Sequence, residues 1–437
     1  MTDTMNTLEC VLCSRIYPLD IFNPFCAVCG NPLLFPTITE KKRFYLYKDF
    51  SLERYSEILP LKEISKDLLL GEGNTPLVSL KRIKRQFDLP NVLAKNETSN
   101  PTHSFKDRGT AAAVQKAVSL GINKIGTVST GNMASSTAAY GAKAGLRTFV
   151  LVKEDISEEK LLATSVYDPF IIKVKGHYGE LYRKSFEIGN KHNIYFMNST
   201  DPYRIEGYKI TAWELYFQLN KQVPDYIFVP VSAGGHIIGL MKGFQEMMDQ
   251  GLVSRFPFFV GVQAHGCAPM VHSFKAGWEQ YKKIEDSHTI AQSISNPDPP
   301  GGNIVLKWTR KYRSALIDVT DEEILSALKS LSEYEGIFAL PASAAAFAGL
   351  LKFNSQKKID PTKQVVLIIT GSGLKSMKNL SFGENKLHNS TLKDLDQMFS
   401  EHPLFQKKIK SLFEYSIHSN STYYDNRVRS HSFASRH

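Results

Sequence analysis

The sequence contains no stretch of about eighteen apolar residues, the length that a helix needs to cross a bilayer. Residues 1–9 are polar and lack the apolar core of a signal peptide. Lysines and arginines give a net charge of +10, but they are spread along the chain and form no basic cluster interleaved with aromatic residues. We therefore expect a cytoplasmic protein with no membrane contact and no nucleic-acid partner.

Two common phosphate-binding patterns are also absent. The chain has neither the G-x-x-x-x-G-K-[ST] loop of nucleotide hydrolases nor the G-x-G-x-x-G fingerprint of dinucleotide-binding folds. No repeat of fixed period is present either, which excludes solenoids and propellers. What remains is a chain of 437 residues with 42% hydrophobic content, enough for two globular domains and further segments.

Cysteine is scarce except at the N-terminus. Of the five cysteines, four form two C-x-x-C pairs separated by twelve residues: Cys10, Cys13, Cys26 and Cys29. This spacing is typical of a tetrahedral thiolate site, whereas a disulfide framework is not expected in a reducing compartment. We predict a structural zinc ribbon, with a module that has lost its metal as the alternative. Cys267 stands alone and is expected to be a small core residue.

Apolar strands and amphipathic helices alternate through the central part of the chain. This pattern predicts an α/β fold with parallel sheets covered on both faces, in two doubly wound domains. The predicted strands are 92–95, 124–129, 148–152, 171–174, 194–197, 226–231, 258–262 and 365–370. The predicted helices are 107–120, 133–144, 158–166, 179–190, 205–219, 237–248 and 342–352, with further helical character at 52–70.

The predicted domains follow from these elements. Residues 1–35 form the cysteine-rich module, 36–97 and 204–385 a large α/β domain, and 98–203 a small α/β domain. The alternation stops at residue 386, so 386–437 is expected to be a C-terminal extension. In that extension, 392–415 is predicted to be helical with a break at Pro403, and 419–437 is predicted to be a flexible tail because it is nearly devoid of aliphatic residues.

One lysine stands out in the decapeptide Asn-Pro-Thr-His-Ser-Phe-Lys-Asp-Arg-Gly, residues 100–109. Pro101 fixes a turn, and Ser104 with Asp107 three positions later has the spacing of a capping box. Lys106 would then lie at the positive end of a helix dipole, and burial would lower its pKa further, toward that of a nucleophilic amine. By itself, the decapeptide is equally compatible with a solvated lysine.

Three further turns follow predicted strands, the positions at which ligands bind in doubly wound folds, and two of them lead into a predicted helix. Residues 129–132, Ser-Thr-Gly-Asn, offer hydroxyls and helix N–H groups to a carboxylate, or serve only as caps. Residues 232–236, Ser-Ala-Gly-Gly-His, can direct backbone N–H groups at a phosphate, although close packing also explains the glycines. Thr370 begins the third turn, where its hydroxyl can bind a ligand nitrogen or simply end the strand.

These turns, in this order, resemble those of the pyridoxal-phosphate (PLP) enzymes of the tryptophan-synthase-β type (fold type II), and most closely those of threonine synthases. The resemblance runs from about Gly71 to Lys375, and the cysteine-rich module also resembles that of some threonine synthases. Its markers are residues 72–77 (Glu-Gly-Asn-Thr-Pro-Leu), 104–109 (Ser-Phe-Lys-Asp-Arg-Gly), 129–132 (Ser-Thr-Gly-Asn), 198–207 (Asn-Ser-Thr-Asp-Pro-Tyr-Arg-Ile-Glu-Gly) and 370–375 (Thr-Gly-Ser-Gly-Leu-Lys).

The resemblance implies a role for each turn. Lys106 would form the internal aldimine with PLP, and the other cofactor-binding residues would be Asn132, Ser232, Ala233, Gly234, Gly235, His236 and Thr370. Within this set, Asn132 faces the 3′-oxygen of the cofactor, residues 232–236 its phosphate, and Thr370 its ring nitrogen. Substrate would be bound by Ser104, Ser129, Thr130, Asn198 and Arg204, the last two at a phosphate, for which an arginine fork is well suited.

The implied activity is that of a threonine synthase-like lyase, which converts O-phosphohomoserine and water to threonine and phosphate, in a homodimer. Two alternatives remain open. One is PLP-dependent β-elimination or β-replacement on a serine- or phosphoserine-type amino acid. The other is a non-catalytic binding protein on the same scaffold. His103, which replaces the usual glycine of its motif, is interpreted as an outward-facing side chain or as an added acid–base group.

Overall fold

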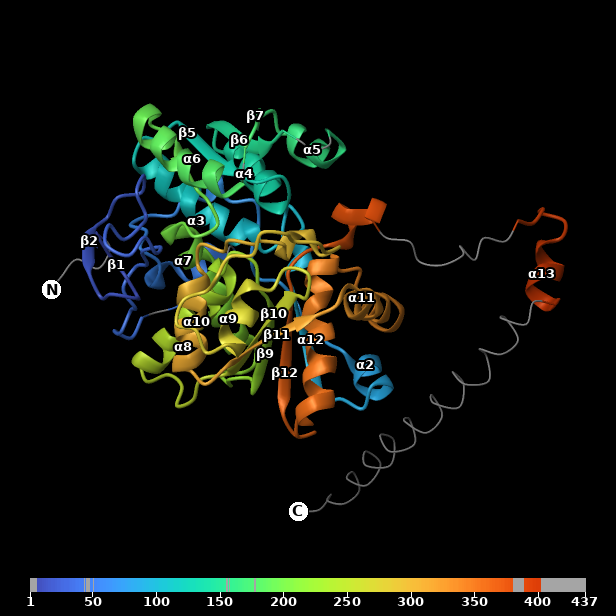
Figure 1. The fold of residues 1–437 in the computed structure, drawn as a ribbon. Helices are drawn as coiled ribbons and strands as arrows, with labels where there is room; N and C mark the ends of the chain where they lie inside the picture. The colour runs from blue at the N-terminus through green and yellow to red at the C-terminus, as the bar shows by residue number, and fades with distance from the viewer. Residues whose placement is uncertain are drawn as a thin grey trace, which may run out of the picture. The chain divides into compact units, whose positions relative to one another are not determined.

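The computed structural model describes residues 6–42, 44, 48–49, 51–154, 156, 158–176, 178–379 and 389–401. Up to residue 379 the described chain forms two mainly parallel sheets flanked by helices, together with a small antiparallel hairpin near the N-terminus (Figure 1). The predicted α/β class is therefore confirmed. The helix α13 (Leu395–Glu401) belongs to a separate unit and is described by itself.

The larger sheet has six strands in the order β11-β10-β9-β12-β4-β3. All neighbours are parallel except β3 and β4, which are antiparallel. The strands are β3 (Leu77–Ser79), β4 (Asn91–Asn96), β9 (Tyr226–Pro230), β10 (Phe258–Ala264), β11 (Ala315–Val319) and β12 (Gln364–Ile369). The two most apolar strands, β9 and β12, lie side by side at the centre, where both faces are covered.

The sheet order decides where the predicted site forms. Strands β4, β12 and β9 are consecutive neighbours and parallel, so their carboxyl ends meet at one edge of the sheet. Three of the four turns singled out in the sequence follow these strands. The Lys106 turn comes after β4, the 232–236 turn after β9, and the Thr370 turn after β12. Turns far apart in sequence are thereby brought to one place.

Helices cover both faces of the larger sheet (Figure 1). On one face lie α8 (Gly235–Asp249), α9 (Pro269–Lys275) and α10 (Gly302–Lys311). On the other lie α2 (Lys81–Gln86), α11 (Asp321–Glu335) and α12 (Pro341–Lys357). Each set contributes to its own hydrophobic cluster, so the sheet separates two cores.

The smaller sheet has four parallel strands in the order β7-β6-β5-β8. They are β5 (Lys124–Val128), β6 (Arg147–Lys153), β7 (Phe170–Val174) and β8 (Tyr195–Phe196). The helices α4 (Asn132–Lys143), α5 (Glu158–Ser165) and α6 (Tyr178–His192) alternate with these strands along the chain. The domain boundaries predicted from the sequence stay predictions, but the strands between residues 124 and 196 all belong to this sheet.

Helix α7 (Pro202–Gln218) packs against both α3 (Lys106–Ser119) and α8. The crossing of α3 and α7 depends on two glycines. A Cβ atom at Gly207 would lie 2.2 Å from the carbonyl oxygen of Arg108, and one at Gly109 would lie 2.5 Å from the Tyr208 ring. Only glycine permits this approach. It brings together the first turns of the two helices, which carry Lys106 and Arg204.

The cysteine-rich module contains the hairpin of β1 (Thr7–Glu9) and β2 (Ile16–Pro18). It packs against elements that belong to both sheets. The Phe25 ring meets Phe186 of α6 edge-on at 5.0 Å, and Lys307 of α10 donates to the carbonyl of Val11 at 2.7 Å. Lys242 of α8 donates to the carbonyl of Phe35 at 2.6 Å. The module therefore links the helices of the smaller sheet to those of the larger one.

Several elements differ from the prediction. The stretch 52–70 is not one helix but α1 (Ser51–Arg54) and two 3-10 turns, Ser56–Ile58 and Lys66–Leu68, because Pro60 lies between them and has no N–H to donate. The elements β3, β11, α2, α9, α10 and α11 were not foreseen. In the C-terminal extension α13 falls within the predicted helical stretch, whereas the rest of that stretch beyond residue 401 and the tail at 419–437 lie outside the described residues.

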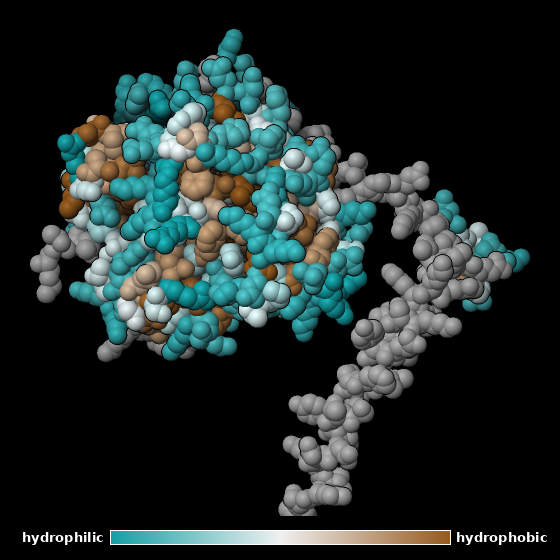
Figure 2. Space-filling view, turned by 60° about the horizontal axis from the view of Figure 1, so that its bottom comes forward, coloured by the Kyte–Doolittle hydropathy of each residue, from teal (hydrophilic) through white to brown (hydrophobic). Residues whose placement is uncertain are grey.

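Hydrophilic side chains cover most of the face shown in Figure 2, with hydrophobic atoms in scattered patches between them. Large exposed hydrophobic residues are correspondingly dispersed along the chain, among them Ile16, Val166, Phe170 and Leu374. Such scatter is usual on protein surfaces. None of the described helices has the length and apolar character required to cross a membrane.

Candidate active site

The Lys106 turn connects β4 to α3 and is shaped by buried hydrogen bonds. The predicted capping box is wrong: Phe105 occupies the N-cap position, and no side chain caps the helix. The carboxyl group of Asp107 instead accepts hydrogen bonds from the backbone N–H and the hydroxyl of Thr102, both at 2.6 Å. The Ser104 hydroxyl is left buried without a partner among the described residues. Thr102 had not been considered as the partner of Asp107.

Lys106 is the first residue of α3, and its amine lies among aromatic rings. Its Nζ atom is 4.3 Å from the centre of the Phe105 ring and 6.0 Å from that of Tyr208. Desolvation, and then the positive charge of Arg204, lower the pKa of Lys106 to about 7. Much of this amine is therefore neutral near neutral pH, the state in which an amine acts as a nucleophile or a base.

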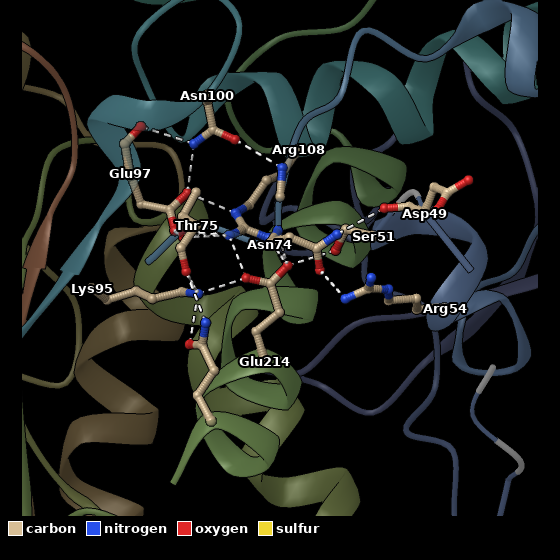
Figure 3. A network of polar contacts seen from close by, with 12 residues as sticks. Asp49, Ser51, Arg54, Asn74, Thr75, Lys95, Glu97, Asn100, Arg108 and Glu214 are labelled. Atoms are coloured by element: carbon tan, nitrogen blue, oxygen red, sulfur yellow. Dashed lines mark hydrogen bonds and ion pairs between the residues drawn. The ribbon is translucent and has the colours of Figure 1, made fainter. Parts of the chain in front are cut away.

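A buried ionic network holds the start of α3 in place (Figure 3). Arg108, two residues after Lys106, donates to Glu97 at 2.6 Å and to Glu214 of α7 at 2.7 Å. Lys95 of β4 donates to the same Glu214 at 2.6 Å. Asn100 bonds to Glu97 at 2.8 Å, which ties the beginning of the lysine turn into the network. Two carboxylates balance two cations, so the buried charge is compensated.

The 232–236 turn lies beside the lysine. Gly234 has a φ of 100°, a left-handed conformation that favours glycine, and it occupies the N-cap position of α8. A Cβ atom at Gly235 would lie 2.4 Å from the carbonyl oxygen of Ser199. The His236 ring stacks on Phe105 with centroids 3.9 Å apart, and both of its nitrogens are buried without a partner among the described residues. Desolvation lowers the pKa of His236 to about 3, so the ring is neutral.

The Thr370 turn is joined to the lysine turn by backbone hydrogen bonds. Phe105 N donates to Thr370 O at 3.0 Å, and Ser372 N donates to His103 O at 3.0 Å. The Thr370 hydroxyl lies 2.7 Å from that of Ser343, which also accepts from Gly371 N at 2.9 Å. The Thr370 hydroxyl is thereby held in a defined position, as an oxygen that faces a ring nitrogen must be.

The 129–132 turn follows β5 of the smaller sheet. Ser129, Thr130 and Asn132 are partly exposed, and the turn leads into α4, whose N-cap position is Gly131. Gly131 N donates to the Ser129 hydroxyl at 3.4 Å. The turn is thus open to a ligand at the positive end of a twelve-residue helix. Helix α4 is linked to α3 further along, where Ser136 bonds to Thr110 at 2.6 Å.

Asn198 and Arg204 are both fully buried and hydrogen-bonded within the protein. Asn198 accepts from Val128 N at 2.9 Å and donates to Ser185 at 2.9 Å. The Arg204 guanidinium donates to one backbone carbonyl and three hydroxyl groups: Met197 O at 2.7 Å, Thr137 at 2.8 Å, Thr110 at 3.0 Å and Tyr208 at 3.4 Å. Four of its five N–H donors are therefore in use. Its role at a substrate phosphate stays a prediction.

Arg204 has no ion pair with a carboxylate among the described residues, although its side chain is fully buried. A buried guanidinium that is bonded only to neutral groups is costly unless an anion compensates it. The Asp201 carboxylate interacts electrostatically with Arg204 without forming an ion pair with its guanidinium, and the positive charge of Arg204 still lowers the pKa of Lys106. The site therefore has a net positive field that an anionic ligand would neutralise.

Several residues of this site were not found from the sequence. Thr110 lies one helical turn after Lys106 on the same face of α3, and this spacing alone could have indicated it. Thr137, Ser343 and Tyr208 carry no local signal, because each reaches the site through the tertiary fold. The structure thus joins the lysine turn to the 232–236 turn, the Thr370 turn and Arg204. The 129–132 turn connects to them through α4, where Ser136 bonds to Thr110 of α3 and Thr137 accepts from Arg204.

His103 points away from the site. Its side chain is exposed, its Nδ1 atom lies 3.3 Å from Thr98 O, and its φ of 59° is left-handed. The outward-facing interpretation is therefore the right one. We expect His103→Gly to stabilise the fold by up to about 1 kcal/mol, since relief of backbone strain exceeds the entropy cost of glycine.

The matched control for this prediction is His103→Ala, which keeps the Cβ atom and therefore the strain. Neither variant should change kcat by more than about twofold, because the imidazole touches no group of the site. Chemical denaturation and steady-state kinetics measure both effects. A large fall of kcat in both variants would mean that the imidazole takes part in the chemistry.

The four N-terminal cysteines form a separate cluster. The Sγ atoms of Cys10 and Cys29 are 3.3 Å apart, those of Cys13 and Cys26 are 3.5 Å apart, and all four lie within 4.8 Å of one another. Burial raises the pKa of Cys26, but the Tyr17 hydroxyl and nearby backbone N–H groups outweigh it and lower the value to about 6. The cluster has the geometry of a metal site, because zinc–sulfur bonds of about 2.3 Å place tetrahedral sulfurs about 3.8 Å apart.

The residues around Lys106 fit a PLP group. A desolvated lysine can bind an aldehyde. A glycine turn with a left-handed N-cap residue, together with a neutral histidine that has no hydrogen-bond partner in the described part of the chain, can receive a phosphate. A fixed threonine hydroxyl can face a ring nitrogen. Together with the parallel strands β4, β12 and β9, whose carboxyl ends meet at this edge, they define the class of the protein: a PLP-dependent enzyme of fold type II.

Comparisons with known proteins confirm this class and identify relatives within it. The profile described as "Pyridoxal-phosphate dependent enzyme" matches residues 68–371, so the chain belongs to this enzyme family. Threonine synthase of Methanocaldococcus jannaschii is 36% identical over 376 residues, which are 84% of this chain and 92% of that one. Threonine synthase of Halalkalibacterium halodurans is 36% identical over 80% of this chain and 96% of its own. The enzyme is thus a PLP-dependent lyase of the threonine synthase type.

Solved structures confirm the fold. The processed threonine deaminase isoform 2 of Solanum lycopersicum superposes with a TM-score of 0.59 at 20% identity, over 76% of this chain and 83% of that one. Cysteine synthase of Entamoeba histolytica superposes with a TM-score of 0.60 at 20% identity, over 78% and 97%. At this level of identity the likeness concerns the fold alone.

The pKa of Lys106 makes a prediction about cofactor loading. Because the neutral amine is the form that binds the aldehyde, the rate at which the apoenzyme binds PLP should rise up to about pH 7 and level off by about pH 8. An ordinary lysine, with a pKa near 10.4, would instead give about a tenfold rise per pH unit over this range. Stopped-flow absorbance measures the rate, with N-acetyl-lysine as the control amine. If the rate of PLP binding to the apoenzyme rose about tenfold per pH unit between pH 7 and 9, the lowered pKa of Lys106 would be contradicted.

Proposed function

We propose that the enzyme converts O-phosphohomoserine and water to threonine and phosphate, with PLP bound through Lys106. The observation that supports this best is that Arg204 lies close enough to Lys106 for its positive charge to lower the pKa of the Lys106 amine. The Arg204 guanidinium is fully buried and forms no ion pair with a carboxylate among the described residues. A substrate that carries a phosphate would supply the missing anion. The threonine synthases to which the chain is similar support the same substrate.

Each side chain has a role in this proposal. PLP, when bound, withdraws electrons from the α-carbon of the amino acid. The Lys106 amine, once freed by substrate, takes the α-proton and then a β-proton as a general base. Thr370 would place its hydroxyl at the ring nitrogen of PLP, which would leave that nitrogen unprotonated. Ser129 and Thr130 hold the substrate carboxylate at the start of α4. Arg204 selects the phosphate and stabilises its departure.

The atoms of the proposed reaction balance. The bond between the γ-carbon and oxygen breaks, and its electron pair leaves with the phosphate. The β-carbon loses a hydrogen, which the γ-carbon gains, and takes the hydroxyl of a water molecule. The remaining proton of that water goes to the phosphate. The α-carbon recovers its own proton before threonine leaves.

The decisive experiment offers the PLP-loaded enzyme O-phosphohomoserine and, separately, O-phosphoserine. Released phosphate and amino-acid product are measured together. We expect phosphate and threonine in equal amounts from the first compound and little phosphate from the second. Turnover of phosphoserine alone would show that the enzyme acts by β-elimination or β-replacement and would overturn the proposal.

We further propose that Cys10, Cys13, Cys26 and Cys29 hold a structural zinc ion. The purified protein should contain one zinc per chain, and Cys13→Ser should lower both the zinc content and the melting temperature, because metal binding stabilises such modules directly. Cys267→Ser, at the buried cysteine outside the cluster, is the control and should leave the zinc content unchanged. Full zinc content in Cys13→Ser would exclude the site.

A further inference from the structure

A second buried amine lies near Lys106 and has no role in the proposed function so far. Lys375 belongs to the 3-10 segment Gly373–Asn379 that follows the Thr370 turn. Its Nζ atom is buried and makes no hydrogen bond to any described residue. Burial of an amine without a hydrogen-bond partner destabilises the folded state, because the hydration of the amine is lost and not replaced. Buried polar atoms without a partner are therefore rare in folded proteins. The cost is explained if a ligand completes the site.

The backbone places this amine beside the lysine turn. Ser104 and Gly371 form an isolated antiparallel bridge, and Lys375 N bonds to Ser372 O at 3.3 Å. Ser104 is itself fully buried, and its hydroxyl is also without a hydrogen-bond partner among the described residues. Two polar groups on bridged segments, a hydroxyl and an amine, are thus both free to donate.

The Asp107 carboxyl group acts electrostatically on Lys375 but accepts no hydrogen bond from its amine. Both oxygens of this carboxyl group already accept 2.6 Å hydrogen bonds from Thr102. Burial raises the pKa of Asp107, which weakens it further as a counterion. Burial also lowers the pKa of Lys375 to about 8, so the amine is still mostly charged at neutral pH. Its positive charge therefore remains only partly compensated.

Hydroxyl groups connect this amine's surroundings to Arg204. Asp107 interacts with Ser136, the Ser136 hydroxyl bonds to Thr110 at 2.6 Å, and Thr110 accepts from Arg204 at 3.0 Å. Arg204 stands at one end of this polar row and Lys375 near the other. Only one of the five guanidinium N–H groups of Arg204 is not already hydrogen-bonded within the described part of the protein. Arg204 alone therefore cannot donate to all the acceptor oxygens of a phosphate.

We propose that Lys375 is a second cationic residue of the phosphate subsite, and that with the Ser104 hydroxyl it binds the phosphate group opposite Arg204. The inference rests on the proposed function for the identity of the substrate but not for the existence of the subsite. It assigns a ligand to a buried amine that makes no hydrogen bond to any of the described residues. The same subsite would bind inorganic phosphate, the product of the reaction.

Inorganic phosphate is therefore the probe, and the holoenzyme is the protein to use, because the cofactor's own phosphate then fills the 232–236 turn. Calorimetry should show that Lys375→Gln weakens phosphate binding about ten- to a hundredfold, which is the effect of losing one charge-assisted hydrogen bond. Lys375→Arg should recover part of the affinity. The KM for the phosphorylated substrate should rise in Lys375→Gln by a similar factor, with a smaller change of kcat.

The control is Lys329→Gln on α11, whose amine is largely exposed and pairs with Glu333. It should leave phosphate affinity unchanged, and none of the three variants should have a melting temperature below that of the wild type. Unchanged phosphate affinity in Lys375→Gln would overturn the inference, as would equal weakening in the control or a wild-type holoenzyme that binds no phosphate at millimolar concentration. If phosphate binds through Lys375 but phosphohomoserine is not turned over, the proposed function fails and the subsite stands.

Discussion

Lys106→Ala is expected to lower kcat by at least about a thousandfold and to abolish the visible absorption of the bound cofactor. The amine is both the attachment point of PLP and the proposed general base, so one substitution removes two functions. The fold should survive. Lys106 is desolvated and faces the positive charge of Arg204, so its removal relieves an unfavourable interaction and should leave the melting temperature equal or higher.

Lys116→Ala is the matched control for this variant. Lys116 lies on the same helix, ten residues further on, and its amine contacts the Tyr203 ring at 5.5 Å. It should keep both the visible absorption and the activity. Reduction with borohydride followed by mass spectrometry tests covalent attachment directly: the wild type and Lys116→Ala should gain the mass of the cofactor, and Lys106→Ala should not. Cofactor fixed covalently to Lys106→Ala would show that another lysine, such as Lys375, is the attachment point.

The sequence predicted most of what depends on local chemistry. Short, wholly apolar runs such as that of β9 are typical of buried parallel strands. Glycine, serine and threonine at the ends of such strands indicate turns that bind ligands. The order of the turns then indicated the family. Of the elements that were missed, α9, α10, β11 and α11 lie between residues 265 and 340, and β3 and α2 lie between residues 77 and 86. One of them had a usable signal: Thr320 and Glu323 form a capping box at the start of α11.

What could not be predicted depends on contacts between distant segments. Arg204 is bonded to Met197, Thr110 and Thr137, which come from three different parts of the chain, and no local pattern announces such a set. The same holds for the stacking of His236 on Phe105. The predicted cap at Ser104 failed for a related reason, because Thr102 competes for the carboxylate that the capping box required.

The second large effect is expected at Glu214, which is not among the residues assigned to the cofactor or the substrate. Its two oxygens accept hydrogen bonds from Ser51 at 2.6 Å, Asn74 N at 2.7 Å, Lys95 at 2.6 Å and Arg108 at 2.7 and 2.8 Å. Burial alone would raise the pKa of this carboxyl, but Arg108 and Lys95 outweigh it and hold the pKa well below its usual range. Glu214 therefore joins α7, α3 and β4 at the base of the lysine turn (Figure 3).

Glu214→Gln keeps the shape of the side chain but leaves Arg108 and Lys95 with Glu97 as their only carboxylate. We expect the free energy of unfolding to fall by about 3–5 kcal/mol, because one buried positive charge loses its partner. Activity should fall as well, since Arg108 fixes the first turn of α3 and with it the direction of Lys106. Because the folded-state pKa is depressed, the wild type should lose the stabilisation by Glu214 only as the pH falls below about 4.3, the unfolded value.

The control for Glu214→Gln is Glu333→Gln, which breaks the exposed pair with Lys329. Exposed pairs contribute little, so this variant should unfold within about 0.5 kcal/mol of the wild type. Urea denaturation at neutral pH measures both variants, and repetition at pH 4 tests the linkage: the difference between wild type and Glu214→Gln should begin to shrink, because the carboxyl is then partly protonated in the unfolded state and still ionised in the folded state. Equal stability of the two variants at neutral pH would mean that the buried network does not hold the lysine turn, and that Lys106 is positioned by the packing of α3 against α7 alone.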